Sequence, residues 1–413
     1  MSVTTLAIYK PKSIYEKITI NIMSSMPYGR CNLTLPGGEV FEFGNGDGVS
    51  CNVTVHNYDL FKKFILFGDI GFGESYVDGD WDCDNLTNFV SWVLLNVTHV
   101  PTLSGNQIST KIGLNLLNFI NKVEHYFRRN DLSGSRRNIS EHYDLGNDFY
   151  SLWLDDTMTY SAAYFTEESL DLRTAQLAKY ERLCEQLKLQ PEDHVLEIGS
   201  GWGSMAAYMA GTYGCKVTTI TLSVEQQKLA RERMKKNGVD HLVNVELVDY
   251  RAVEGKFDKI VSIEMLEAVG AKYLPVYFST VNRLLKPQGI FAMQVITCPD
   301  SRFDALRKNV DWIQKHIFPG SLLPSVGAIN KAVNATSELT LVDLKDLGLD
   351  YAKTLNRWHK TFNEKLDEVK SLGFDNRFIR KWNYYLCYCE AAFAMRNINV
   401  MQMVYVRPNN LVL

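Results

Sequence analysis

The chain contains 413 residues, of which 46% are hydrophobic and 22% are charged. This balance is typical of a folded globular protein and excludes a disordered or collagenous chain. The formal net charge of -3 gives no general attraction to polyanions, which argues against nucleic acid as a partner. The eight cysteines include no CxxC pair, so neither a metal site nor a disulfide framework is predicted. Such usage is typical of a reducing, cytoplasmic setting.

The hydrophobic segments are short. The N-terminal residues include lysines and a glutamate, so they do not predict a secretory signal peptide. The longest apolar run, FVSWVLLNV from Phe89, covers about half of a membrane span. We therefore expect no transmembrane helix, and any contact with lipid should be peripheral.

Residues 1–120 are predicted to form a small α+β domain. NLTLPGGEVFEFG has the pattern of a β-hairpin with its turn at Pro36, Gly37 and Gly38. The segment that follows predicts an amphipathic helix, a glycine-broken loop and a second helix, capped by Asp84 or Asn85.

Residues 121–145 are predicted to form a basic linker. It contains four arginines around a Ser-Gly-Ser turn, Arg128, Arg129, Arg136 and Arg137. The segment is either a solvated connector or a strip that attracts phosphate groups, with Phe127 beside it as an apolar contact.

Residues 146–413 are predicted to form an α/β domain. From about Leu177, short apolar strands such as HVLEIGSG and KVTTITLS alternate with helical segments such as SMAAYMAGTYG. This alternation predicts a doubly wound, Rossmann-like parallel sheet. Residues 299–396 are mostly helical and rich in aromatic side chains, which suggests a substrate cover, before a last strand at VMQMVYVR.

The segment from Glu197 to Gly203, EIGSGWG, follows a predicted strand and opens a helix, where open α/β sheets bind nucleotide-like ligands. Gly199 and Gly201 allow close approach of the backbone. A dinucleotide fingerprint would need a glycine at Ser204. The spacing instead suits S-adenosylmethionine, whose amino group Glu197 can hold, although a plain strand-to-helix turn remains possible.

Two further strands end in polar residues, Thr221 with Gln226, and Asp249 with Tyr250. The chain here resembles the cyclopropane-fatty-acid synthase family of S-adenosylmethionine-dependent methyltransferases, which includes mycolic acid cyclopropane synthases. The resemblance covers nearly the whole chain and is carried by HYDLGNDFYSLWLDDTMTYSAAYF, LEIGSGWGS, TLSVEQQ, VDYR, SIEMLEAVG, IFPGSLLPS and GLDYAKTL. It implies the class I methyltransferase fold with a helical lipid-pocket insertion.

The resemblance also implies a cofactor site. Thr221 and Gln226 are expected to hydrogen-bond the ribose or the methionine part, and Tyr250 to lie against the adenine. The complete expected set is Tyr160, Ser161, Glu197, Gly199, Gly201, Trp202, Thr221, Gln226, Asp249 and Tyr250.

The implied reaction is methyl transfer to a cis double bond through a carbocation, with a bound bicarbonate as the base. Glu267, Tyr351 and the backbone of Ile296 match its ligands. Ala162, Ala268 and Gln294 depart from the family pattern of a cysteine and two histidines. Gln294 can still donate through its amide, so a weaker anion site remains open. We expect methyl-branched or methylene products to be plausible beside cyclopropane.

The implied substrate is an unsaturated acyl chain in a membrane phospholipid. Peripheral membrane contact is expected through the N-terminal domain and the linker, and a homodimer is plausible. Two alternatives stay open. Plant amine N-methyltransferases resemble the same family, and the three departures could mark a protein that binds S-adenosylmethionine or lipid without turnover.

Overall fold

The computed structural model describes residues 9–97, 99 and 145–410. The chain divides into two compact units, each of them discontinuous in sequence. The first unit consists of Met1–Phe127, Val310–Ile317 and Leu366–Asn397, and the second of Arg128–Asn309, Phe318–Lys365 and Ile398–Leu413. The predicted cover, residues 299–396, is therefore divided between the two units. The linker arginines lie outside the described residues.

The first unit is built on a four-stranded sheet of order β2-β1-β3-β4. Its strands are β1 (Arg30–Thr34), β2 (Val40–Phe43), β3 (Ser50–Val55) and β4 (Trp81–Cys83). Its helices are α2 (Ile14–Ser24), α3 (Asp59–Val77), α4 (Leu86–Asn96), α14 (Trp312–His316), α17 (Leu366–Ser371) and α18 (Asn376–Ala394). Helix α18 packs on α3 and α4.

The N-terminal predictions are confirmed in two places and wrong in one. Strands β1 and β2 form the predicted antiparallel hairpin, and the Asn85 side chain caps α4 by accepting from the backbone N–H of Asn88. The glycine-broken loop is instead part of α3, which continues through a kink at Gly68 (φ +61°). Gly68 itself has a non-helical backbone, which glycine adopts without a Cβ clash, so two helical stretches meet there at a kink and residues after Gly68 are helix rather than loop.

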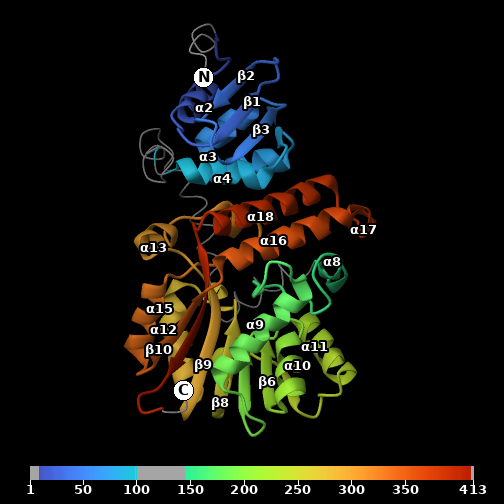
Figure 1. Cartoon of the computed structure of the whole chain (residues 1–413), viewed down its shortest axis with the longest axis vertical. Coiled ribbons are helices and arrows are strands. Elements are labelled where there is room, and N and C mark those ends of the chain that lie inside the picture. The colour runs from blue at the N-terminus through green and yellow to red at the C-terminus, as the bar shows by residue number, and fades with distance from the viewer. Residues whose placement is uncertain (1–8, 98, 100–144, 411–413) are drawn as a thin grey trace. The chain divides into compact units, whose positions relative to one another are not determined.

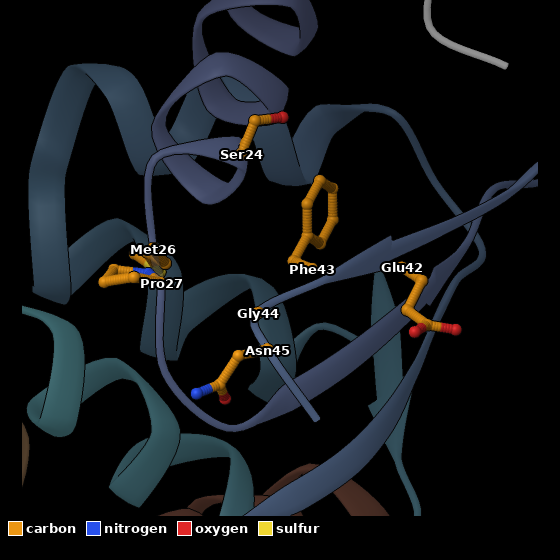
Figure 2. A pocket seen from close by; sticks show the side chains of 7 residues that line it. All are labelled: Ser24, Met26, Pro27, Glu42, Phe43, Gly44 and Asn45. Carbon is orange, nitrogen blue, oxygen red and sulfur yellow. The ribbon is translucent and has the colours of Figure 1, made fainter. Parts of the chain in front are cut away.

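A shallow pocket in the first unit lies beside β2 and the end of α2 (Figure 2). It is lined by Ser24, Met26, Pro27, Glu42, Phe43, Gly44 and Asn45. Its one ionisable side chain, Glu42, lies 3.8 Å from the Arg30 guanidinium in an exposed ion pair. Nothing in this pocket marks it as a catalytic site.

The second unit contains a seven-stranded sheet of order β10-β11-β9-β8-β5-β6-β7 (Figure 1). Its strands are β5 (His194–Ile198), β6 (Lys216–Thr221), β7 (Val243–Leu247), β8 (Phe257–Ile263), β9 (Leu285–Thr297), β10 (Thr340–Asp346) and β11 (Asn399–Val406). Strands β5 to β9 are parallel, as predicted, and β11 pairs antiparallel with β9. Strand β10 was not predicted; its alternating exposure is that of a sheet edge.

Helices cover both faces of this sheet (Figure 1). Alternate residues of β5 point to opposite sides: Val195 packs in the core with α9, α10 and α11, and Leu196 packs in the core with α12 and α15. The helices are α8 (Asn147–Ser151), α9 (Leu172–Leu187), α10 (Ser204–Tyr213), α11 (Val224–Lys236), α12 (Leu274–Leu284), α13 (Asp300–Leu306), α15 (Val326–Thr336) and α16 (Gly348–Glu364).

The strand order reverses at β5, which lies between β6 and β8. In open α/β sheets the crevice at the carboxyl ends of the strands beside such a reversal is the usual ligand site. The loops after β5, β6, β7 and β8, together with the end of β9, therefore meet at one edge of this sheet. None of the described helices is long and apolar enough to cross a membrane.

Candidate active site

The loop after β5 is shaped by three glycines with positive φ, Gly199 (+100°), Gly201 (+48°) and Gly203 (+88°). A Cβ placed on Gly201 would meet no atom within 4 Å, so the loop borders open space there. A Cβ on Gly203 would lie 2.9 Å from the Cβ of Ala230 in α11. A ligand can therefore approach the backbone of this loop closely at Gly201. The missing side chain of Gly203 allows the first turn of α10 to pack directly on α11.

Polar residues at the ends of β5 and β6 lie beside this loop. The Glu197 carboxylate accepts a hydrogen bond of 2.5 Å from the Thr219 hydroxyl, and burial raises the pKa of Glu197 to about 8. The Thr221 hydroxyl donates to the side-chain oxygen of Gln226 at 2.8 Å. Ser223 caps α11 through the Gln226 N–H. The pair Thr221 and Gln226 is thus held in one orientation at the mouth of the crevice.

The loop after β7 forms a 3-10 turn, Tyr250–Ala252. Asp249 binds the Arg251 guanidinium through both carboxylate oxygens, at 2.7 and 2.6 Å. The Arg251 guanidinium lies 5.3 Å from the centre of the Tyr250 ring, and Tyr277 packs edge-on to that ring at 5.3 Å. Asp249 therefore fixes Arg251, which in turn holds the ring that is expected to lie against adenine.

An aromatic cluster surrounds Tyr160. The Tyr160 ring centre lies 5.5 Å from those of Tyr150 and Trp153, and 5.4 Å from that of Trp358. Trp202 packs on Tyr150 at 5.2 Å, and its indole N–H donates to Asn147. Rings from three parts of the chain, residues 150–160, Trp202 and Trp358, thus pack together, and aromatic faces of this kind stabilise cations and exclude water.

Helix α16 fixes one side of this cluster and positions Tyr351. Its Asp350 and Thr354 accept from the backbone N–H groups of Phe165 and Ala163, at 2.9 and 3.0 Å. The Tyr351 ring is edge-on to Trp358 at 5.9 Å, and its hydroxyl lowers the pKa of the Glu264 carboxyl. Tyr351 is buried and lies near a carboxyl group. This position is consistent with its predicted place in the catalytic site.

Ser161 is held by α9. Its hydroxyl accepts from the Lys179 ammonium at 2.7 Å, and its carbonyl accepts from the Gln176 amide. Lys179 is fully buried, and this burial lowers its pKa, against the opposing effect of the Glu264 charge.

Glu267 is buried in the short turn that follows β8. One carboxylate oxygen accepts from the backbone N–H of Ile296 at the end of β9. The other oxygen, Oε2, is buried without a hydrogen-bond partner. Burial, reinforced by the charge of Glu264, raises the pKa of Glu267 to about 8. Burial therefore favours the protonated form of this carboxyl at neutral pH.

Glu264, which was not among the predicted site residues, directly follows β8 and has φ +46°. Its carboxylate oxygen Oε1 accepts from the backbone N–H of Ala162 and from the Gln294 amide, both at 2.8 Å. Burial raises the pKa of Glu264, while the bonds from Gln294 and Ala162, the Lys179 charge and the Tyr351 hydroxyl lower it. The one feature of the sequence that could have pointed to Glu264 is that it is a second glutamate, three residues before Glu267 in SIEMLEAVG.

These contacts occupy the donors expected for bicarbonate. The two N–H groups of the Gln294 amide point to Glu264 and to the Ala162 carbonyl, and the Ile296 N–H points to Glu267. The residues present therefore fit a pair of resident carboxyls rather than an added anion. Ala268 lies in the same turn and supplies no polar side-chain atom.

The carboxyl pair adjoins the cofactor loop. A Cβ on Gly199 would lie 3.3 Å from the Met265 side chain, between Glu264 and Glu267 in sequence. The loop expected to hold the cofactor and the turn with the two carboxyls are thus packed together. Within residues 9–97, 99 and 145–410, no group of three or more metal-ligating side chains was found.

Sequence comparison places the chain among lipid-modifying enzymes. The family model described as mycolic acid cyclopropane synthetase matches residues 130–403. The chain is 38% identical to a tuberculostearic acid methyltransferase of Mycobacterium tuberculosis, over 88% of this chain and 85% of that protein. It is 39% identical to cyclopropane-fatty-acyl-phospholipid synthase of Escherichia coli, over 86% of this chain and 88% of that protein.

Structural comparison agrees. The cyclopropane synthase MmaA2 of Mycobacterium tuberculosis superimposes with a TM-score of 0.61 at 27% identity, covering 66% of this chain and 98% of that one. A mycolic acid cyclopropane synthase complexed with SAH and CTAB gives 0.60 at 29% identity, covering 65% and 97%. The predicted fold, the methyltransferase class and the use of S-adenosylmethionine are thereby confirmed. The chain belongs to the mycolic acid cyclopropane synthetase family of S-adenosylmethionine-dependent methyltransferases.

Proposed function

We propose that this enzyme methylates the double bond of an unsaturated acyl chain in a membrane phospholipid, through a carbocation. S-adenosylmethionine supplies the methyl group on a sulfonium centre. The expected product is a cyclopropane or a methyl- or methylene-branched acyl chain. The family supports methyl transfer to lipid acyl chains; the phospholipid and the carbocation are our own inference.

The observation that carries the proposal is the aromatic cluster around Tyr160. An isolated alkene is a weak nucleophile, so the reaction needs close positioning in a water-free space. Attack of the alkene π electrons on the methyl carbon breaks the carbon–sulfur bond and leaves a positive charge on the chain. The faces of Tyr160, Trp153 and Trp358 would stabilise that charge and exclude water that would trap it.

The carboxyl groups support the second half of the reaction. The cation must lose a proton, either from the new methyl group or from a chain carbon. Glu264 and Glu267 place two carboxyls next to the cofactor loop. An amine N-methyltransferase would not need to shelter a carbocation. Coclaurine N-methyltransferase matches this chain at 18% identity, a likeness of fold alone.

Incubation with vesicles of monounsaturated phospholipid and S-adenosylmethionine carrying a fully deuterated methyl tests the proposal. Mass spectrometry of the released acyl chains is expected to find the label in lipid. Retention of all methyl deuterium would indicate proton loss from the chain and a methyl-branched alkene. Loss of one deuterium would indicate a cyclopropane or methylene product. A chain that binds S-adenosylmethionine but labels no lipid would contradict the proposal and favour an amine substrate or a binding protein.

Peripheral membrane contact is part of the same proposal, because a phospholipid acyl chain must leave the bilayer to reach a buried site. A homodimer belongs to it only through the family resemblance. Flotation of the enzyme with anionic vesicles is expected, and substitution of both Arg128 and Arg129 should weaken it. Unchanged flotation of that double variant would reject the basic linker as the contact.

A further inference from the structure

We propose that Glu264 is the built-in base of this enzyme, in the place of an added bicarbonate, and that turnover does not depend on bicarbonate. The inference rests on the proposed function, since it concerns the proton lost from the methylated acyl chain. The evidence is the set of hydrogen bonds around Glu264, and in particular which donor groups bind this carboxylate.

The first step is the match between the donors of Glu264 and those expected for the anion. An anion at this place was expected to bind Glu267, Gln294, Tyr351 and the Ile296 backbone. Gln294 donates to Glu264 at 2.8 Å, the Tyr351 hydroxyl lowers the pKa of Glu264, and the Ile296 N–H binds Glu267. The backbone N–H of Ala162, the position at which the family usually has a cysteine, also points to Glu264. A carboxylate carried by the chain therefore has part of the surroundings of the expected anion, and the remaining donor is taken by Glu267.

The second step is the orientation of the Gln294 amide, which a chain of hydrogen bonds fixes. The Arg182 guanidinium is a donor only and points to the side-chain oxygen of Gln402 at 3.2 Å. The amide nitrogen of Gln402 then donates to the oxygen of Gln294 at 3.0 Å. The Gln294 nitrogen must therefore face Glu264, at 2.8 Å. Because this nitrogen only donates, it favours the charged form of Glu264.

The third step is the difference between the two carboxyls. Glu264 accepts several hydrogen bonds and lies near the Lys179 charge, whereas Glu267 accepts one and has a buried, unpartnered oxygen. Two neighbouring carboxyls are disfavoured as two charges, so the pair is expected to share one proton. The pKa of both carboxyls is raised by burial, but only Glu264 is surrounded by several donors, so we assign the negative charge to Glu264 and the proton to Glu267. A second anion beside that charge would be repelled.

The chemical step balances with these groups alone. A C–H bond of the cationic chain breaks, and the proton passes to the Glu264 carboxylate. The electron pair of that bond remains on the substrate, where it closes the ring or forms a double bond and cancels the positive charge. Glu264 is left as the neutral acid and returns its proton to water after the product leaves.

The backbone at Glu264 allows a sharp test. Its φ of +46° suits glycine, so Glu264→Gly removes the carboxylate and leaves a space without straining the turn. Glu264→Gln keeps the shape and fills that space, and serves as the matched control. Both variants and the wild type are assayed for label transfer from deuterated S-adenosylmethionine to phospholipid, in buffer stripped of carbon dioxide and with added bicarbonate or formate. Binding of S-adenosylhomocysteine is measured in parallel.

We expect wild-type turnover to be the same with and without bicarbonate. Both variants should lose about 10²- to 10⁴-fold in turnover, the usual contribution of a positioned base, while still binding S-adenosylhomocysteine. Formate or bicarbonate should restore part of the activity of Glu264→Gly and none of that of Glu264→Gln.

If the wild type does label lipid, three results would overturn the assignment of Glu264 while leaving the proposed function intact. These are bicarbonate-dependent wild-type turnover, undiminished turnover in both variants, and an inactive, cofactor-binding Glu264→Gly that neither anion restores. Absence of label in lipid from the wild type would overturn the proposed function and this assignment with it.

Discussion

The cofactor side and the carboxyl side of the site are built differently. On the proposed cofactor side, the features are local: the backbone shape of one short loop, Gly199 to Gly203, and neighbouring residues such as Thr221 and Gln226. On the carboxyl side, Glu264 is defined by groups from distant segments, including Ala162, Gln294 and Tyr351. The difference predicts that substitutions on the first side affect ligand binding, and those on the second affect turnover.

The largest effect is expected for Glu267→Gln. This change keeps the shape of the side chain but removes the acid that shares a proton with Glu264, so the carboxyl pair can no longer relay the proton lost by the substrate and turnover should fall by about 10²- to 10⁴-fold. Affinity for S-adenosylhomocysteine should stay near that of the wild type, because Glu267 binds Ile296 rather than the glycine loop. Calorimetric titration beside the lipid assay checks both halves. Undiminished turnover would remove Glu267 from the site.

On the cofactor side, Gly203→Ala should weaken the fold itself. The substitution forces a Cβ into a φ of +88° and to 2.9 Å from the Ala230 side chain, and strain at such a position costs about 1–3 kcal/mol. Gly238→Ala is the matched control, since Gly238 has φ +68° but open space around its Cβ. Urea unfolding should give the larger loss for Gly203→Ala. Equal losses would mean that backbone strain alone matters.

The protonated Glu267 also predicts a pH dependence of stability. A carboxyl whose pKa rises from 4.5 to about 8 on folding binds a proton in the folded state that the unfolded state lacks. Stability is then lost as pH rises between those values, by at most about 1.4 kcal/mol per pH unit for one group. Glu267→Gln should remove this slope. The free energy of unfolding of both proteins, measured at pH 6 and pH 8, checks it; parallel curves would contradict it.

The smallest effect is expected for Thr221→Val. The substitution keeps the volume but loses the hydrogen bond from the Thr221 hydroxyl to Gln226, worth about 1 kcal/mol. Affinity for S-adenosylmethionine should fall by up to about tenfold, with turnover at saturation unchanged. A loss of turnover at saturating cofactor would show that the two sides are not separable in this way.

The same contrast explains what the sequence alone could predict. Local periodicity and motif resemblance were enough to predict strands β5 to β9 and the glycine loop. They also singled out Glu267, the second member of the carboxyl pair. Strand β10 lies at a sheet edge, where its exposed, alternating residues give a weak signal. Glu264 could not be assigned a role, because nothing local to SIEMLEAVG indicates that Ala162 and Gln294 would donate to it.

The interleaving of the two units has a consequence for synthesis on the ribosome. Helix α18 completes the first unit by packing on α3 and α4, and Arg380 in α18 donates to the backbone carbonyls of Tyr76 and Trp81. The N-terminal segment therefore emerges long before its C-terminal partner and must wait with its apolar surface uncovered. A truncated protein that begins at the second unit would likewise leave the buried Trp382 and Tyr384 of α18 without their partners. The N-terminal domain and this helix therefore have to be expressed and engineered together.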